Sequence, residues 1–183
     1  MKKLAILLAF ISTSVFAGSI EAGYDFKNKV NSTADHSVYS LQYNTAALVD
    51  GLTVGVKTEN ETVKTTDALE GLIQGQAKYS IATGTMFTPF ANAAIGQKFK
   101  NTNNFSFWVA GVGVKAALTD KVSVEGAWRR REALEASNNY ATDEYSVKAA
   151  YEIAQNHIVG VKYARERGTS DYNTTGAFYQ YKF

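Results

Sequence analysis

The sequence predicts an all-β protein, a transmembrane antiparallel up-and-down β-barrel of about ten strands, with about eight as the alternative. Three observations favour this fold. Side chains alternate between apolar and polar with a period of two along almost the whole chain after residue 17. No stretch beyond that point approaches the roughly 18 consecutive apolar residues that a spanning helix needs. The aromatic side chains of the apolar parity gather at predicted strand ends, which is typical of the girdles of spanning barrels.

The chain divides into residues 1–17, a predicted secretory signal peptide, and residues 18–183, the predicted barrel. Two lysines precede an apolar run over residues 4–11, and small residues lead to Ala17, after which we expect cleavage. An apolar first helix or a membrane anchor is the alternative interpretation. The run is too short for an anchor, because the hydrocarbon core of a bilayer is roughly 30 Å thick.

Each predicted strand has one apolar and one polar parity. In the first, Ile20 and Tyr24 alternate with Glu21 and Asp25, and the later strands repeat this pattern. In chain order, the predicted strands centre on residues 19–26, 39–44, 52–57, 73–81, 91–98, 108–115, 122–129, 144–151, 159–163 and 177–183. The weakest are those near residues 86–98 and 157–167, and a barrel without them has about eight strands.

The predicted connections alternate between short and long. The short ones are 45–50, 83–87, 119–121 and 154–156, and the long ones are 27–35, 58–68, 100–104, 131–141 and 166–172. Short periplasmic turns and longer outer loops are typical of outer-membrane barrels. This threading places one group of aromatics near the long loops and a second near the short turns. The first is Tyr24, Phe26, Tyr39, Phe99, Trp108, Trp128, Tyr145 and Tyr163, and the second is Tyr43, Tyr79, Tyr151, Tyr179, Tyr181 and Phe183.

A soluble antiparallel sandwich also alternates with a period of two, and it is the alternative fold. A soluble core gives no reason for sorting its aromatics into two belts, whereas a membrane does. A sandwich also exposes strand edges, which lipid cannot satisfy and barrel closure removes.

Several segments resemble those of a known family. The chain ends in alternating aromatics, Tyr179, Tyr181 and a terminal Phe183, and segments 88–91 and 111–114 are similar to hairpin strands of small outer-membrane barrels. The resemblance is to the OmpA-like, opacity-type and porin-like barrels of Gram-negative bacteria, which usually have about eight strands. It implies the outer membrane as the location, after export, and recognition of the three terminal aromatics by the barrel-assembly machinery. It does not select an activity, because that family includes adhesins, structural proteins and narrow channels.

Composition excludes several function classes. The sequence has no cysteine, which excludes disulfides and thiol chemistry. A net charge of +2 with interspersed signs does not indicate a nucleic-acid partner. No carboxylates and histidines have the spacing of a metal site, so we expect no metal and no cofactor.

We expect the protein not to be an enzyme. The alternative is an omptin-like hydrolase at the outer rim, since Asp35 and His36 are adjacent in a predicted outer loop. No second acidic pair matches them, so a solvated loop histidine is the favoured interpretation. His157 is predicted beside a short turn on the opposite side of the membrane.

The polar parity predicts a charged lumen. Its charged members are Glu21, Asp25, Lys57, Lys78, Lys98, Lys115, Glu125, Arg129, Glu144, Lys148, Lys162 and Lys182. These charges either pair with one another inside a closed lumen or line a narrow pathway with mild anion preference. Phe90, Phe107 and Phe178 share the inward parity and favour the closed version.

The leading function is therefore a non-enzymatic barrel, either a scaffold with surface-exposed loops or a narrow porin-like diffusion channel. Arg130 and Arg165 are predicted to face outward beside Trp128 and Tyr163, where guanidinium groups bind lipid phosphates or simply extend to the interface. The expected partners are outer-membrane lipid, including lipopolysaccharide, and the assembly machinery. The sequence does not identify an extracellular partner of the loops.

Overall fold

The computed structural model describes residues 17–30, 35–46, 49–63, 68–100, 103–169 and 171–183. Within them the chain forms ten strands and one short 3-10 helix. They are β1 (Gly18–Lys29), β2 (Asp35–Thr45), β3 (Leu52–Val63), β4 (Ala68–Ser80), β5 (Phe87–Phe99), β6 (Phe105–Ala117), β7 (Val122–Ala133), η2 (Ala136–Asn138), β8 (Ala141–Ala154), β9 (His157–Gly168) and β10 (Tyr172–Lys182). The predicted signal peptide lies outside the described residues except for Ala17. No helix in the described part of the chain is long and apolar enough to cross a membrane.

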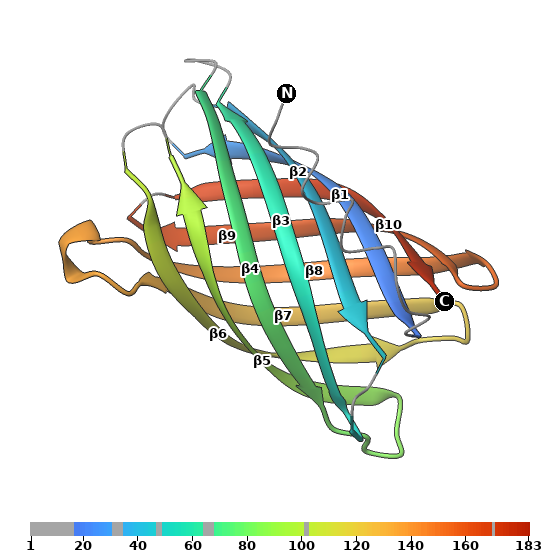
Figure 1. Ribbon diagram of the computed structural model, residues 1–183. Helices are drawn as coiled ribbons and strands as arrows, with labels where there is room; N and C mark the ends of the chain where they lie inside the picture. The colour runs from blue at the N-terminus through green and yellow to red at the C-terminus, as the bar shows by residue number, and fades with distance from the viewer. Residues whose placement is uncertain (1–16, 31–34, 47–48, 64–67, 101–102, 170) are drawn as a thin grey trace.

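The ten strands form one closed antiparallel barrel (Figure 1). Each strand pairs with its neighbours in the chain, and β1 pairs with β10 along its whole length, from Ser19 opposite Lys182 to Lys29 opposite Tyr172. Closure leaves no strand edge unpaired, which is the condition for a sheet in lipid. The prediction of about ten strands is confirmed, and the two weak segments near residues 86–98 and 157–167 are β5 and β9.

The outer surface of the barrel is apolar. Ile95 and Val161 are 62% and 61% exposed, which is unfavourable in water and favourable against lipid tails. Exposed aliphatic side chains form a band that also includes Val56, Ile73, Val112 and Val147. Exposed aromatics flank it as Tyr24, Tyr39, Phe99, Trp128, Tyr145 and Tyr163 on the side of the β1–β2 connection, and as Tyr79, Tyr151, Tyr179, Tyr181 and Phe183 on the side of the termini.

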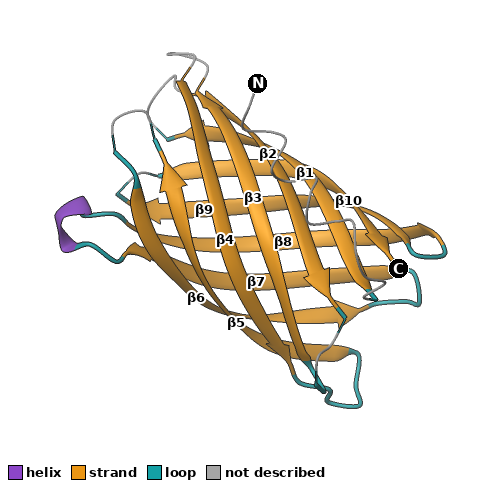
Figure 2. Ribbon diagram, in the orientation of Figure 1, coloured by secondary structure: helices purple, strands orange, loops and turns teal. Residues whose placement is uncertain are grey.

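The connections at the two ends differ less in length than the sequence predicts. The end that was predicted to carry long loops has connections of three to seven residues, and the end with the termini has connections of two to six. That prediction was wrong because the polar stretches assigned to loops continue as strands: β3, for example, runs on to Val63. Their polar side chains face the lumen and interact there, rather than with water outside the barrel. We call the end opposite the termini the outer end. It is a rim of short connections that includes η2 (Figure 2).

Candidate functional site

The lumen holds the charged residues that the alternation assigned to it. Nine of the predicted lining residues surround a cavity in the half of the lumen nearer the termini, which we call the inner cavity: Glu21, Lys57, Lys78, Lys115, Glu125, Arg129, Glu144, Lys148 and Lys162. Asp25 and Lys98 lie beyond the lining of that cavity, in ion pairs with other lumen residues. The two halves of the lumen have different structures.

A network of ion pairs crosses the outer half of the lumen. Glu61 of β3 is at its centre, with one carboxylate oxygen 2.7 Å from His36 Nδ1 and the other 3.2 Å from Lys98 Nζ. Lys98 also lies 3.1 Å from Glu70. Lys27 lies 4.0 Å from Glu61 and 3.0 Å from Glu166. We call these six residues the outer plug. They come from β1, β2, β3, β4, β5 and β9, so the contacts span the bore.

An apolar cluster packs in the same half of the lumen. Leu72, Phe105, Phe107 and Val109 are at most 5% exposed, and Ala94, Ala133 and Tyr140 pack against them. The Arg131 guanidinium lies 5.2 Å from the centre of the Phe107 ring and donates to the Tyr140 hydroxyl at 3.4 Å. Burial by itself would raise the pKa of the Tyr140 phenol. The positive charges of Arg131 and Lys98 outweigh this effect and bring that pKa below its ordinary value.

Ion pairs also join residues of the wall at mid-lumen. Arg129 of β7 donates to Glu144 of β8 at 2.6 Å, and Lys162 of β9 donates to Asp25 of β1 at 2.5 Å. Within β3, Lys57 lies 2.7 Å from Glu59. Burying a charge without a partner costs several kcal/mol, on the order of the free energy of unfolding of a small domain. These lumen charges are therefore compensated within the barrel wall.

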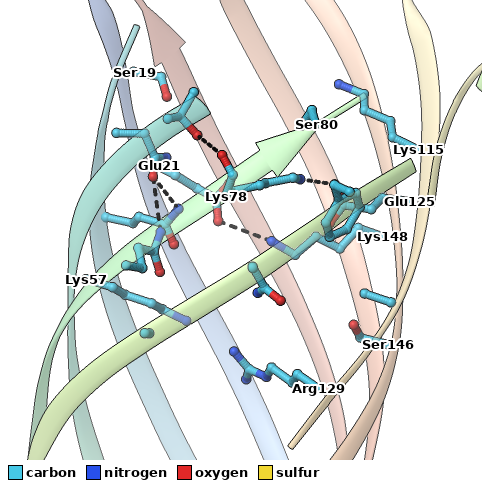
Figure 3. A pocket seen from close by; sticks show the side chains of 18 of the residues that line it. Ser19, Glu21, Lys57, Lys78, Ser80, Lys115, Glu125, Arg129, Ser146 and Lys148 are labelled. Atoms are coloured by element: carbon cyan, nitrogen blue, oxygen red, sulfur yellow. Dashed lines mark hydrogen bonds and ion pairs between the residues drawn. The ribbon is translucent and has the colours of Figure 1, made fainter. Parts of the chain in front are cut away.

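The inner cavity has a volume of about 440 Å³. Figure 3 shows side chains that line it. Lys78 lies 2.9 Å from Glu125, and Lys148 lies 3.5 Å from Glu21. These side chains are 18–35% exposed, whereas those of the outer plug are 10–19% exposed. Solvent therefore reaches the lumen from the end with the termini. Val109 of the apolar cluster and Ala94, which packs against the cluster, also line the cavity, so the cluster adjoins its far end.

Three inward phenylalanines fit a narrow lumen because each lies over a glycine. The cross-strand pairs are Phe90 with Gly113, Phe107 with Gly96 and Phe178 with Gly160. A Cβ atom at Gly96 would lie 2.6 Å from Phe107 Cζ, and the other two glycines would meet their rings more closely still. The missing side chains let the rings lie against the wall. The structure thus places all three rings in the lumen, as their parity predicts.

The placement of His36 corrects the sequence interpretation. It is not a solvated loop residue: it lies within β2, faces the lumen, is 8% exposed and bonds Glu61. The reason is that β2 begins at Asp35, so His36 takes the inward parity. Its ring also meets Tyr172 edge-on at 5.2 Å. A rim dyad of Asp35 and His36 finds no support in this geometry, because the two side chains point to opposite faces of β2.

The outward arginines and the chain terminus lie where the sequence predicts them in the fold. Arg130 pairs with Glu132 and Asp143, both at 3.2 Å, and Arg165 donates to Asn173 at 2.7 Å. At the other end, His157 bonds the Tyr179 hydroxyl at 2.7 Å, within the girdle of terminal aromatics.

Several lumen residues were not singled out from the sequence. They are Lys27, Glu59, Glu61, Glu70, Arg131, Tyr140 and Glu166. All but Tyr140 share the parity of a neighbouring lumen residue in their strand. Continuing the alternation beyond the aromatic belts would have identified these lumen residues. Their segments were instead assigned to loops, because a polar composition is also typical of loops. No group of three or more His, Cys, Asp or Glu side chains in the described residues is arranged to hold a metal ion.

The comparisons with known proteins agree with this architecture. The outer membrane protein PagN of Salmonella typhimurium (strain LT2) is 25% identical over 181 residues, with 82% of this chain and 73% of PagN covered. No protein-family model matches the sequence.

The fold is also found in solved structures of outer-membrane channels and porins. An outer membrane channel from Pseudomonas putida F1 superposes with a TM-score of 0.61 at 10% identity, covering 94% of this chain and 97% of the channel. The KdgM porin in complex with disordered oligogalacturonate gives a TM-score of 0.53 at 12% identity, covering 90% of this chain and 99% of the porin. At such low identity these likenesses concern the fold alone. The chain is therefore a closed antiparallel β-barrel with an apolar outer surface, similar in sequence to the outer membrane protein PagN and in fold to an outer membrane channel.

Proposed function

We propose that this protein is a non-enzymatic outer-membrane barrel with a closed lumen, which acts as a scaffold for the surface formed by its outer rim. The observation that carries the proposal is the outer plug. Its ion pairs join residues from six strands inside the bore, and the apolar cluster around Phe107 fills the space beside them. A barrel of about eight strands is just wide enough to be filled by its side chains, and ten strands add little to that width.

A narrow diffusion channel is the second candidate. The inner cavity favours it, because an ion entering from the end with the termini meets resistance only in the outer half. Both candidates agree with the similarity to an outer membrane protein, and they differ in whether the outer plug opens.

Planar-bilayer recording separates the two. The wild type should insert without steady conductance. A triple variant with Glu61→Ser, Lys98→Ser and Phe107→Ala should conduct, because these changes remove the centre of the plug and the ring beside it. Conductance of this variant also shows that the protein preparation inserts into the bilayer. A steady wild-type conductance, equal to that of the triple variant, would refute the closed lumen and favour the channel.

We also propose that Arg130 and Arg165 contact lipid phosphates, including those of lipopolysaccharide. Each guanidinium has five N–H donors, more than its recorded partners use. Replacing both arginines by glutamine should lower the thermal stability of the barrel in lipopolysaccharide-containing membranes and leave it unchanged in phosphatidylcholine. An equal loss in both lipids would mean that the arginines serve only their ion pairs.

A further inference from the structure

We propose that the inner cavity is a blind pocket that binds one small hydroxylated organic anion, such as a polyol carboxylate, entering from the end with the termini. Its volume of about 440 Å³ lies within the roughly 300–1,000 Å³ of ligand pockets. Ser19 and Ser80, at the ends of β1 and β4, mark the mouth, and Arg129 lies deep in the pocket (Figure 3). The lumen side chains at the mouth are the more exposed ones, so a solute from that side has access.

The lining supplies a positive charge that lacks a counter-ion. Five of its cations pair with carboxylates of the barrel wall: Lys57, Lys78, Arg129, Lys148 and Lys162. The structure gives the sixth, Lys115, no ion pair with any described residue, and this side chain is exposed in the lumen near the mouth. Lys115 faces Glu125 across the β6–β7 register, but Glu125 is already bonded by Lys78. An anion in the pocket would give Lys115 a partner.

The lining also supplies acceptors that lack donors. Gln74 Oε1 and Asn92 Oδ1 are buried side-chain oxygens without a hydrogen-bond partner, and both residues line the pocket. Gln74 is 4% exposed, and its amide nitrogen is committed to Gln76 at 3.0 Å. A buried acceptor without a donor is unfavourable, so these oxygens favour a ligand that donates hydrogen bonds. Ligand hydroxyl groups do this, whereas a carboxylate does not.

The two requirements together define the ligand class. A simple anion satisfies Lys115 alone, and a neutral polyol satisfies only Gln74 and Asn92. A hydroxylated anion satisfies both sets from one molecule. Cations held over aromatic rings, Lys78 at 3.6 Å from the Phe90 ring centre and Lys148 at 5.3 Å from that of Phe178, add positive potential to the same space.

The test is equilibrium dialysis of radiolabelled gluconate against the full barrel in a non-ionic detergent at low ionic strength. We expect saturable binding of one gluconate per barrel. Unlabelled acetate and sorbitol, which offer the charge or the hydroxyls alone, should compete at least tenfold more weakly than unlabelled gluconate. Lys115→Gln should weaken gluconate binding about tenfold, because a charge-assisted bond is lost. Lys121→Gln, in the exposed β6–β7 turn, is the matched control and should bind as the wild type does.

Asn92→Ala tests the hydroxyl contacts separately and should weaken gluconate while leaving the weak competition by acetate unchanged. Heat-modifiable migration on gels shows that each variant is folded. Absence of saturable binding, sorbitol as effective as gluconate, or wild-type affinity in Lys115→Gln would each overturn the proposal. The blind pocket rests on the proposed closure of the outer half, but the experiments distinguish failure of the two proposals. A barrel that conducts and still binds gluconate would refute closure and would still support the anion site.

Discussion

Substitution of Glu61 by glutamine removes the charge at the centre of the outer plug while keeping the size of the side chain. In the wild type this carboxylate accepts hydrogen bonds from His36 at 2.7 Å and from Lys98 at 3.2 Å. Lys98 keeps Glu70, and Lys27 keeps Glu166, after the change. The variant therefore weakens the plug without leaving either lysine unpaired.

The expected cost follows from these contacts. A hydrogen bond to a charged group contributes about 1.5–3 kcal/mol and a neutral one about 1 kcal/mol, so two bonds lose about 1–4 kcal/mol in total. Breaking a buried ion pair outright costs about 3–5 kcal/mol, which sets the upper limit because both lysines keep a partner. We expect Glu61→Gln to lower the free energy of unfolding by about 2–3 kcal/mol.

Urea unfolding in lipid vesicles, followed by tryptophan fluorescence, measures this loss. The matched control is Glu132→Gln, since Glu132 is also a strand glutamate paired with a cation, Arg130, but on the outward face, where its side chain is 42% exposed. An exposed pair contributes about 0–1 kcal/mol, so the control should unfold nearly as the wild type does. If the two variants unfold at the same urea concentration, the outer plug does not stabilise the barrel and the reasoning fails.

Three further predictions concern single residues. Gly160→Ala should lower the free energy of unfolding by about 1–3 kcal/mol because its Cβ displaces the Phe178 ring, whereas Gly126→Ala, with open space around it, should be neutral in the same urea assay. Phe183→Ser should reduce the amount of folded barrel in the outer membrane, measured on unheated gels of membrane fractions; normal levels would contradict its role as an assembly signal. His36→Ala should lower the free energy of unfolding by about 1.5–3 kcal/mol through the lost bond to Glu61, and a hydrolytic activity that disappears with this variant would contradict a non-enzymatic barrel.

The sequence by itself determined the barrel fold and the division of residues between lipid and lumen, whereas it left the strand number open between about ten and about eight. The reason is that a strand has a side-chain period of two, and a barrel in lipid has only two environments to sort. Knowing that Ile95 is outward therefore fixes Gly96 and Lys98 as inward without any knowledge of their neighbours. The same rule carried Phe90, Phe107 and Phe178 into the lumen.

Only the tertiary structure decided where strands end and which charges meet. Polar residues such as Glu59 and Glu61 have the composition of a loop, and only the pairing of β3 with β2 and β4 shows that they continue the strand. Partner choice depends on the register and tilt of the strands, because Lys98 meets Glu61 from a strand 37 residues away. His36 was assigned to a solvated loop because the sequence did not show that β2 begins at Asp35. The separation of a plugged outer half from an open inner cavity is likewise a property of side chains packed across the lumen, which alternation along one strand does not encode.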